Sequence, residues 1–216
     1  MTSSKVALVA GGTGLIGNLL IKILKEDSLY SRVKCLTRRP LGIQDQKIEE
    51  IRTDGDNLAD LGDRLKADDV FCCLGTTIKK AGTKEAFRKV DFDYPLLLAK
   101  AARQRGASQY LLVSALGADP DSSVFYNRVK GEVEREVSKV DFPAFHIFRP
   151  SLLLGERDEK RVGEDIGKAF SKWFGFLIPK KYKAIDAIRV ARAMIHMAKQ
   201  GRNGKFIHES EELQKF

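Results

Sequence analysis

Short apolar segments alternate with segments of helical periodicity along the whole chain, and this alternation constrains the fold most. The first apolar run, KVALVA at 5–10, precedes apolar residues at helical spacing between Leu15 and Leu24. DDVFCCLG at 68–75 is apolar almost throughout, as expected of a strand buried on both faces. Further strands are expected at 32–37, 47–52, 109–114, 145–148 and 204–209, and further helices around 58–65, at 84–105 (interrupted near Pro95), 123–140, 160–174 and 186–200. The pattern predicts one Rossmann-like α/β domain over 1–216, with a doubly wound, mostly parallel sheet of about seven strands.

Composition places the chain among globular proteins and limits its partners. It has 216 residues, 43% of them hydrophobic and 31% charged. No apolar run is long enough to span a membrane, and no apolar leader precedes the first glycines, so we expect a cytoplasmic protein without a membrane span. The net charge of +9 is scattered. Its densest cluster, Lys180, Lys181 and Lys183, lacks a series of stacking aromatics, so we expect no nucleic-acid partner.

Cysteines and histidines indicate neither a disulfide nor a metal site. Cys35, Cys72 and Cys73 all fall in apolar, strand-like stretches, which favours reduced, buried thiols. The three histidines are far apart and lack metal-ligand spacing, so no metal is expected.

A glycine-rich loop, AGGTGLIG at 10–17, joins the first expected strand to the first expected helix. A glycine in the turn frees the backbone, the next lets a pyrophosphate approach, and the last allows close packing of helix on sheet. The helix N-terminus would offer its free N–H groups to phosphates. The alternative is an ordinary tight turn. The context favours a dinucleotide site, and its expected contacts here are Gly11, Thr13, Gly14, Leu15, Ile16 and Gly17.

The end of the second expected strand indicates which dinucleotide binds. A site for NAD carries an acidic residue there to bind the ribose 2′-hydroxyl, but this strand ends in CLTRRP. Arg38 and Arg39 suit a 2′-phosphate, so we predict NADP(H). Alternatively, both arginines only face solvent. Asp54, after the third strand, could contact the adenine amino group or cap a helix.

The pattern Tyr-x-x-x-Lys occurs twice, from Tyr30 to Lys34 and from Tyr126 to Lys130. Tyr30 is expected before the second strand, at the wrong edge of the sheet. Tyr126 and Lys130 are expected on one face of the helix after the fifth strand, which ends at Ser114. Carboxyl ends of strands are where open α/β sheets bind ligands, which favours the second copy. The alternative is a turn serine and an ordinary helix tyrosine.

These features resemble the short-chain dehydrogenase/reductase superfamily. The segments FCCLGTT, KVDFDYPLLLAKAA, LLVSALGAD, YNRVKGEVE and FRPSLLLGER are similar to the family of the human Tat-interactive protein and its small bacterial NAD(P)-binding relatives, an atypical branch. The resemblance covers about residues 5 to 200. It implies an NADP(H)-binding oxidoreductase acting on a small carbonyl or alcohol substrate.

The resemblance also implies a role for each site residue. Tyr126 would be the general acid/base, Lys130 would lower the pKa of Tyr126 and bind the nicotinamide ribose, and Ser114 would hold the substrate oxygen. Residues implied to line the cofactor are Leu74, Gly75, Thr76, Pro150 and Ser151.

Two departures from the superfamily pattern leave alternatives open. Asp91 stands where many members have an asparagine of the proton relay, and it could hold a water or pair with Lys130. The apolar stretch 169–179, inside a short substrate-side segment at about 156–183, could roof a pocket for an apolar ligand, pack in the core or form a homodimer contact. Partner binding by the human relative, together with Asp91, also leaves open an NADP(H)-sensing regulatory or scaffold protein without turnover.

Overall fold

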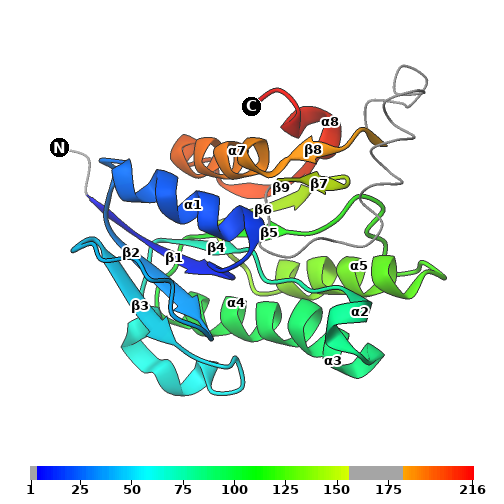
Figure 1. The fold of residues 1–216 in the computed structure, drawn as a ribbon, viewed down its shortest axis with the longest axis horizontal. Helices are drawn as coiled ribbons and strands as arrows, with labels where there is room; N and C mark the ends of the chain where they lie inside the picture. The colour runs from blue at the N-terminus through cyan, green and yellow to red at the C-terminus, as the bar shows by residue number, and fades with distance from the viewer. Residues whose placement is uncertain (1–3, 156–181) are drawn as a thin grey trace.

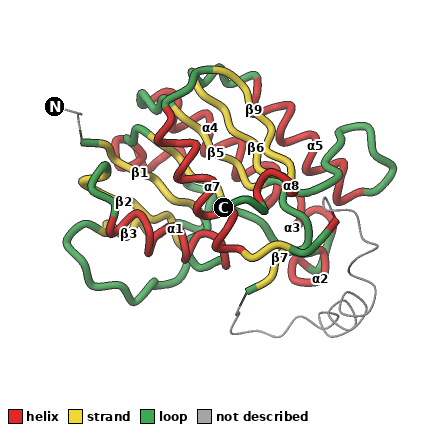
Figure 2. The backbone as a smooth tube through the Cα atoms, turned by 90° about the horizontal axis from the view of Figure 1, so that it is seen from above, coloured by secondary structure: helices red, strands yellow, loops and turns green. Residues whose placement is uncertain are grey.

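Seven parallel strands form the central sheet of the computed structural model, which describes residues 4–155 and 182–216. Every neighbouring pair is parallel, in the order β3-β2-β1-β4-β5-β6-β9 (Figure 2). The strands are β1 (Lys5–Ala10), β2 (Tyr30–Thr37), β3 (Ile48–Arg52), β4 (Asp69–Cys72), β5 (Gln109–Val113), β6 (Ala144–Arg149) and β9 (Gly204–Glu209). The chain reverses direction along the sheet between β3 and β4, which confirms the predicted doubly wound fold.

Helices cover both faces of this sheet (Figure 1). One face carries α1 (Leu15–Glu26) and α7 (Ala187–Gln200), which pack against each other. The other carries α4 (Tyr94–Gln104) and α5 (Phe125–Ser138). Shorter helices are α2 (Ile78–Ala81), α3 (Lys84–Arg88) and α8 (Ser210–Leu213).

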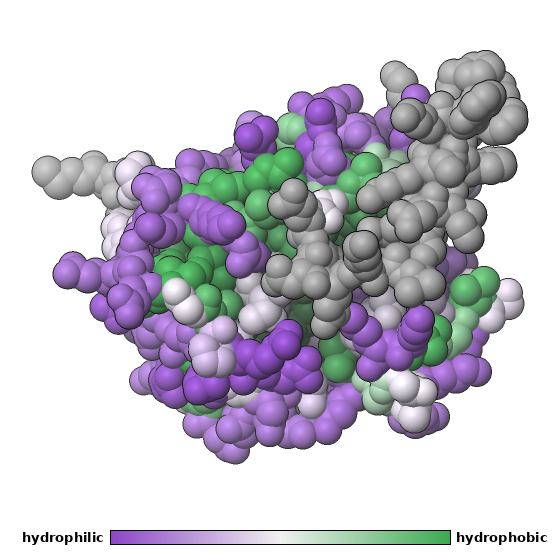
Figure 3. Space-filling view, viewed as in Figure 1, coloured by the Kyte–Doolittle hydropathy of each residue, from purple (hydrophilic) through white to green (hydrophobic). Residues whose placement is uncertain are grey.

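Each central strand supplies both halves of the core because its side chains alternate between faces. In β1, Ala7 and Val9 pack with α1 and α7, whereas Leu8 and Ala10 pack on the opposite side. This explains why the strands read as continuous apolar runs. The surface in Figure 3 is mostly hydrophilic, with apolar side chains over α1, where Leu19 and Ile23 are only partly buried.

One predicted helix differs in type from the structure, and another is interrupted near Pro95 as expected. The segment Leu58–Leu65 is a 3₁₀ helix, η1, broken where Gly62 takes a φ of 52°. The predicted helix 84–105 is interrupted by a π-helix, η2 (Lys89–Asp93), just before Pro95. Proline has no N–H to donate to the carbonyl four residues earlier, which favours a wider turn there.

The substrate-side segment is only partly visible in the described residues. Two short parallel strands, β7 (Leu153–Leu154) and β8 (Ile185–Asp186), pair with each other, which the sequence did not predict. The predicted helix 160–174 and the apolar stretch 169–179 lie outside the described residues. Within the described ranges, no helix combines the length and apolar character needed to cross a bilayer.

The glycine loop requires glycine because backbone passes over backbone. Gly11 has a φ of +85°, and a Cβ there would lie 2.5 Å from the carbonyl oxygen of Cys73, after β4. A Cβ on Gly17 would lie 2.3 Å from the carbonyl oxygen of Gly11. The turn between β1 and α1 therefore fits only without side chains at these two positions.

Gly11→Ala should destabilise the protein more than Gly42→Ala does. Both glycines have positive φ, so alanine costs about 1–2 kcal/mol at either position. Only Gly11 faces backbone, since a Cβ at Gly42 meets nothing within 4 Å among the described residues. The clash should add about 1–3 kcal/mol. Urea unfolding of the two variants measures the difference, and equal losses would contradict the close approach.

Candidate active site

All the predicted site loops lie at one edge of the sheet because each follows the carboxyl end of a parallel strand. The glycine loop follows β1, and Arg38 and Arg39 follow β2. Asp54 follows β3, and Ser114 follows β5. Leu74, Gly75 and Thr76 come after β4, and Pro150 and Ser151 come after β6. The structure therefore brings together loops far apart in sequence at the edge where open α/β sheets bind ligands.

The N-terminus of α1 offers unpaired N–H groups to a ligand. Gly14 precedes the helix, has no side chain to cap it, and donates its own N–H to Gly11 at 2.9 Å. The first turn contains no acidic residue. The N–H groups of Leu15, Ile16 and Gly17 begin the helix, where the dipole favours an anion. Thr13 and Leu15 border the loop on its outer side, exposed and half-buried respectively.

Arg38 and Arg39 are exposed at the end of β2, and neither forms an ion pair with another described residue. The side chain of Thr37 accepts the N–H of Arg39, which shapes the turn after the strand. Asp54 is exposed and accepts the N–H of Asp56 at 3.0 Å. That bond lies within the loop before η1, whose N-cap is Asn57, so Asp54 does not cap the helix, while the arginines remain free to meet an anionic ligand.

Lys130 of α5 forms a buried ion pair with Asp91 of η2. Its Nζ lies 2.7 Å from Asp91 Oδ1, and the two side chains are 6% and 0% exposed. Asp91 Oδ2 accepts the N–H of Thr76 at 2.8 Å. Gly75 is exposed beside the pair, where a Cβ would lie 3.4 Å from Asp91 Oδ1 and 3.7 Å from Lys130 Nζ. Of the two roles considered for Asp91, pairing with Lys130 is the one observed.

Tyr126 lies one helical turn before Lys130 and is half-buried, with its ring 5.6 Å from that of Phe87. Its hydroxyl makes no hydrogen bond to another described residue. Burial lowers the pKa of Lys130, but the charge of Asp91 and, at high pH, that of ionised Tyr126 together outweigh it, so the pKa of the ammonium is raised above 10.5. Lys130 is therefore cationic at neutral pH beside a phenol with a free hydroxyl.

Ser114 is buried and turns toward a second charged cluster on α5. Its hydroxyl donates to Glu134, which also accepts Arg149 Nη2 at 2.6 Å and Nε at 3.1 Å. Glu209 of β9 completes the cluster with Arg149 at 3.1 Å. Sequence reasoning missed Glu134 and Arg149. The spacing of 126, 130 and 134 along one helix face was the available signal.

The loops after β4 and β6 are held by backbone contacts and hydroxyls. Leu74 packs against the core beneath α4. Pro150 is buried, and its carbonyl accepts the N–H of Leu116 at 2.9 Å. The N–H and hydroxyl of Ser151 contact Ser210 at 3.1 and 2.9 Å, so the loop after β6 is anchored to the chain end.

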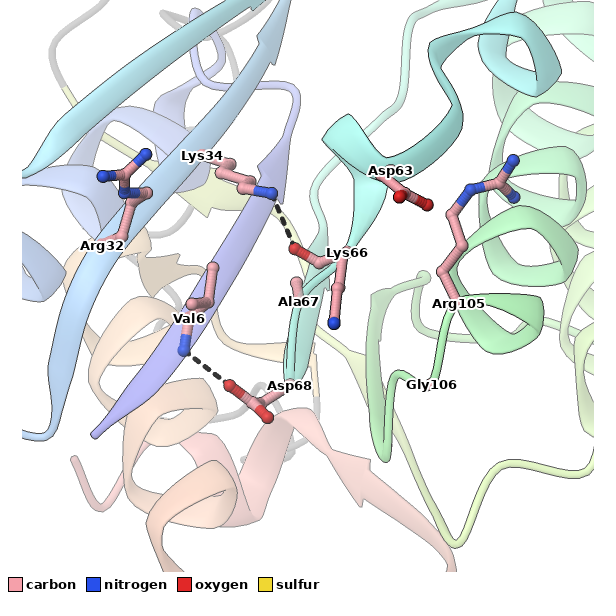
Figure 4. A pocket seen from close by; sticks show the side chains of 9 residues that line it. All are labelled: Val6, Arg32, Lys34, Asp63, Lys66, Ala67, Asp68, Arg105 and Gly106. Carbon is pink, nitrogen blue, oxygen red and sulfur yellow. Dashed lines mark hydrogen bonds between the residues drawn. The ribbon is translucent and has the colours of Figure 1, made fainter. Parts of the chain in front are cut away.

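This edge of the sheet fits a dinucleotide. It combines an uncapped helix N-terminus, exposed glycine backbone at Gly75 beside the charged Lys130, and arginines without an ion pair to a described residue. A separate cavity of about 400 Å³ lies at the opposite edge, near Lys34 and Arg105 (Figure 4). There Lys34 donates to the carbonyls of Arg64 and Lys66 at the end of η1. Its ammonium is therefore already hydrogen-bonded to the backbone.

Comparison with known proteins agrees with a nucleotide-binding role. The family model described as NAD(P)H-binding matches residues 11–200. Protein HTATIP2 of Rattus norvegicus is 36% identical over 200 residues, covering 89% of this chain and 81% of the relative. The mitochondrial protein FMP52 of Candida albicans is 31% identical over 204 residues, covering 91% and 89% respectively.

Solved structures agree on the fold. MoeE5 in complex with UDP-glucose and NAD superposes with a TM-score of 0.71 at 19% identity, covering 93% of this chain and 74% of that chain. The UDP-glucose 4-epimerase of Thermotoga maritima with UDP-glucose gives 0.70 at 15% identity, covering 97% and 80%. At such identities the likeness concerns the fold alone.

The relatives overturn one sequence-based expectation. A cytoplasmic protein was predicted because no leader pattern was found. FMP52 proteins of Candida albicans, Debaryomyces hansenii and Eremothecium gossypii, 31%, 32% and 34% identical to this chain, are named as mitochondrial. The prediction of a cytoplasmic protein is therefore wrong on this comparison.

Glu134→Gln should destabilise the protein by about 1.5–3 kcal/mol, the range for buried hydrogen bonds to charged groups. The variant keeps the shape of the side chain but removes the charge facing Arg149 and Ser114. Glu136→Gln is the matched control on the same helix, since among the described residues Glu136 pairs with the exposed side chains of Lys139 and Arg135 alone. The control should unfold like the wild type in urea, and an equal effect at both positions would contradict a stabilising cluster.

Proposed function

This chain belongs to the NAD(P)H-binding family and to the atypical short-chain dehydrogenase/reductases, and from that premise we propose an NADP(H)-dependent oxidoreductase that reduces a small apolar carbonyl compound. One observation carries the proposal. Tyr126 and cationic Lys130 lie one turn apart on α5, and Lys130 Nζ lies beside exposed Gly75, in the loop after the carboxyl end of β4.

In the proposed reaction, Tyr126 donates the proton that the carbonyl oxygen gains. The bound nicotinamide supplies the hydride. A phenol gives up its proton more readily when a positive charge stabilises the anion, and Lys130 supplies that charge from the next turn. Lys130 would also donate to the nicotinamide ribose, while the glycine loop and the α1 N-terminus hold the phosphates. Leu74, Thr76, Pro150 and Ser151 would border the nicotinamide half of the cofactor.

That Ser114 holds the substrate oxygen stays a prediction. Its hydrogen bond to Glu134 limits how it could do so. Its hydroxyl proton points to Glu134, so in this arrangement the oxygen is left to accept rather than donate. It could therefore accept a hydrogen bond from an alcohol product. To hold a carbonyl oxygen, the hydroxyl would first have to leave Glu134.

An apolar substrate is favoured by exposed apolar side chains near the proposed site. Ile78, Val124 and Leu152 are 41%, 55% and 50% exposed. Ile78 begins α2, which follows the loop after β4, Val124 is the N-cap residue of α5, and Leu152 lies in the loop after β6. Apolar surface near a catalytic edge suits a substrate whose binding removes it from water.

A second candidate is an NADP(H)-sensing regulatory or scaffold protein without turnover. The commitment of Ser114 to Glu134 favours it, since a catalytic serine needs a hydroxyl available to substrate. The free Tyr126 hydroxyl and charged Lys130 favour the enzyme. Turnover of any carbonyl compound with NADPH, and its dependence on Tyr126, separates the two.

Arg38→Ala should weaken NADP(H) binding by about ten- to a hundredfold and leave NAD(H) binding nearly unchanged. The reason is the loss of a charge-assisted contact to the 2′-phosphate. Calorimetry with both cofactors measures the effect. Arg32→Ala, an exposed arginine at the other end of the same strand, should bind both cofactors like the wild type. A wild type that prefers NAD(H) would refute the proposed preference.

Tyr126→Phe should lower turnover at least about a hundredfold, because general acid–base catalysis contributes about 10²–10⁴-fold. The ring packing on Phe87 is kept, so folding and NADP(H) affinity should stay near wild type. The measurement is NADPH absorbance with a panel of carbonyl compounds.

Tyr30→Phe is the control, at the other Tyr-x-x-x-Lys copy. Tyr30 begins β2 at the opposite edge, and its hydroxyl donates to buried Asp69 at 2.7 Å. This variant should lose stability but keep turnover at a temperature where it is folded. Full activity of Tyr126→Phe would rule out Tyr126 as the general acid.

A further inference from the structure

Asp91 links two parts of the proposed site through a single buried carboxylate. One oxygen lies 2.7 Å from Lys130 Nζ, and the other accepts the Thr76 N–H at 2.8 Å. We infer that Asp91 is a positioning residue, which keeps the buried Lys130 ammonium charged and holds it against the loop after β4 before a dinucleotide binds. The inference rests on the proposed function, since only there does Lys130 act on a cofactor and on Tyr126.

Lys130 needs a counter-charge because of where it lies. Its side chain is 6% exposed, and a fully buried amine without a partner can have its pKa lowered by as much as about 3–5 units. Such a lysine would be largely neutral near pH 7. Within the described ranges, Asp91 is the carboxylate that forms an ion pair with it.

The other titratable groups around Lys130 come from β4 and α5. Cys72 of β4 is a buried thiol whose pKa is raised by that burial, so it is neutral at neutral pH. Tyr126 of α5 adds a favourable interaction when ionised. Burial lowers the pKa of Lys130, while Asp91 raises it more strongly than Tyr126 does, and the balance is a raised pKa. Asp91 therefore provides most of the compensation.

The backbone around Asp91 forms a π-helix, which places the carboxylate next to Lys130. Asp91 lies in the π-helix η2, and the N–H of Tyr94 bonds to Lys89 rather than one residue later. Pro95 follows and cannot donate to the Asp91 carbonyl. Such wide turns recur at functional sites. The side chain is fully buried, and its Oδ1 faces the Lys130 ammonium at 2.7 Å, so its charge is directed to Lys130.

The consequence for the proposed reaction is electrostatic. Lys130 can stabilise the Tyr126 phenolate and bind ribose hydroxyls only while it is protonated. Because its pKa is raised in the folded protein, the stabilising charge is present at neutral pH and below about 10.5, and it is lost as the pH rises through the folded-state pKa. Without Asp91, that loss should begin at lower pH.

The first measurement is the titration of Lys130 in the cofactor-free protein. NMR of protein labelled with ¹³C at the lysine ε-carbons follows it, and the resonance missing in Lys130→Met assigns it. In the wild type it should titrate above 10.5 despite burial. In Asp91→Asn, which keeps the size of the side chain, the midpoint should fall by about 1–3 units. A wild-type midpoint below the ordinary lysine value would overturn the inference, even if the variant fails to fold.

The second measurement is the pH dependence of NADP(H) affinity, followed by calorimetry. The pH at which affinity is half lost should move down by about 1–3 units in Asp91→Asn. Asp93→Asn is the matched control, since Asp93 lies in the same π-helix and forms no ion pair with a described residue. It should follow the wild type in both measurements.

The two measurements separate the inference from the function it rests on. If Lys130 titrates as expected but the wild type does not bind a dinucleotide, the proposed function fails. The inference that Asp91 positions Lys130 for a dinucleotide then fails as well. If the wild type binds NADP(H) and Asp91→Asn shows an unchanged lysine titration and pH profile, the function stands and Asp91 is only a packing residue.

Discussion

Parallel pairing of β1 with β2 on one side and with β4 on the other is the arrangement on which the candidate site depends. It places the glycine loop beside both the arginines after β2 and the loop after β4. The pairing is tight enough that backbone meets backbone: the Cys73 N–H bonds to Ala10 at 2.9 Å, and Gly11 has no room for a Cβ over Cys73. A side chain at Gly11 would separate the strands that assemble the site.

Helix α5 contributes one buried charged residue to each of two clusters near that edge. Lys130 pairs with Asp91, and four residues later Glu134 joins Ser114 to Arg149. Buried charges cost desolvation and often add little net stability, but removing one partner is expensive. In the first cluster, Asp91 of η2 therefore holds Lys130 of α5 in place. In the second, Glu134 of α5 holds Ser114 at the end of β5.

Much of the fold could be predicted from the chain because its patterns are strong. Continuous apolar runs such as 68–75 fit strands buried on both faces, and helical spacing after the glycines predicted α1. The seven-stranded doubly wound sheet and the family are confirmed. The 3₁₀ geometry of η1 and the pairing of β7 with β8 were missed, because short elements carry little periodicity. The prediction of a cytoplasmic protein was wrong. It rested on residue patterns alone, and the FMP52 relatives, which are named as mitochondrial, contradict it.

The sequence by itself determined the order of strands and helices, the glycine loop, and the presence of arginines rather than an acid after β2. Those features depend on residue type and local spacing. Only the tertiary structure decided which side chains pair: that Asp91 contacts Lys130 and Thr76, and that Ser114 donates to Glu134. These contacts join residues of different elements, so they depend on how η2, α5 and the ends of β4 and β5 pack together. Spacing along one helix can place 126, 130 and 134 on one face, but it does not say which residues of other elements pack against that face.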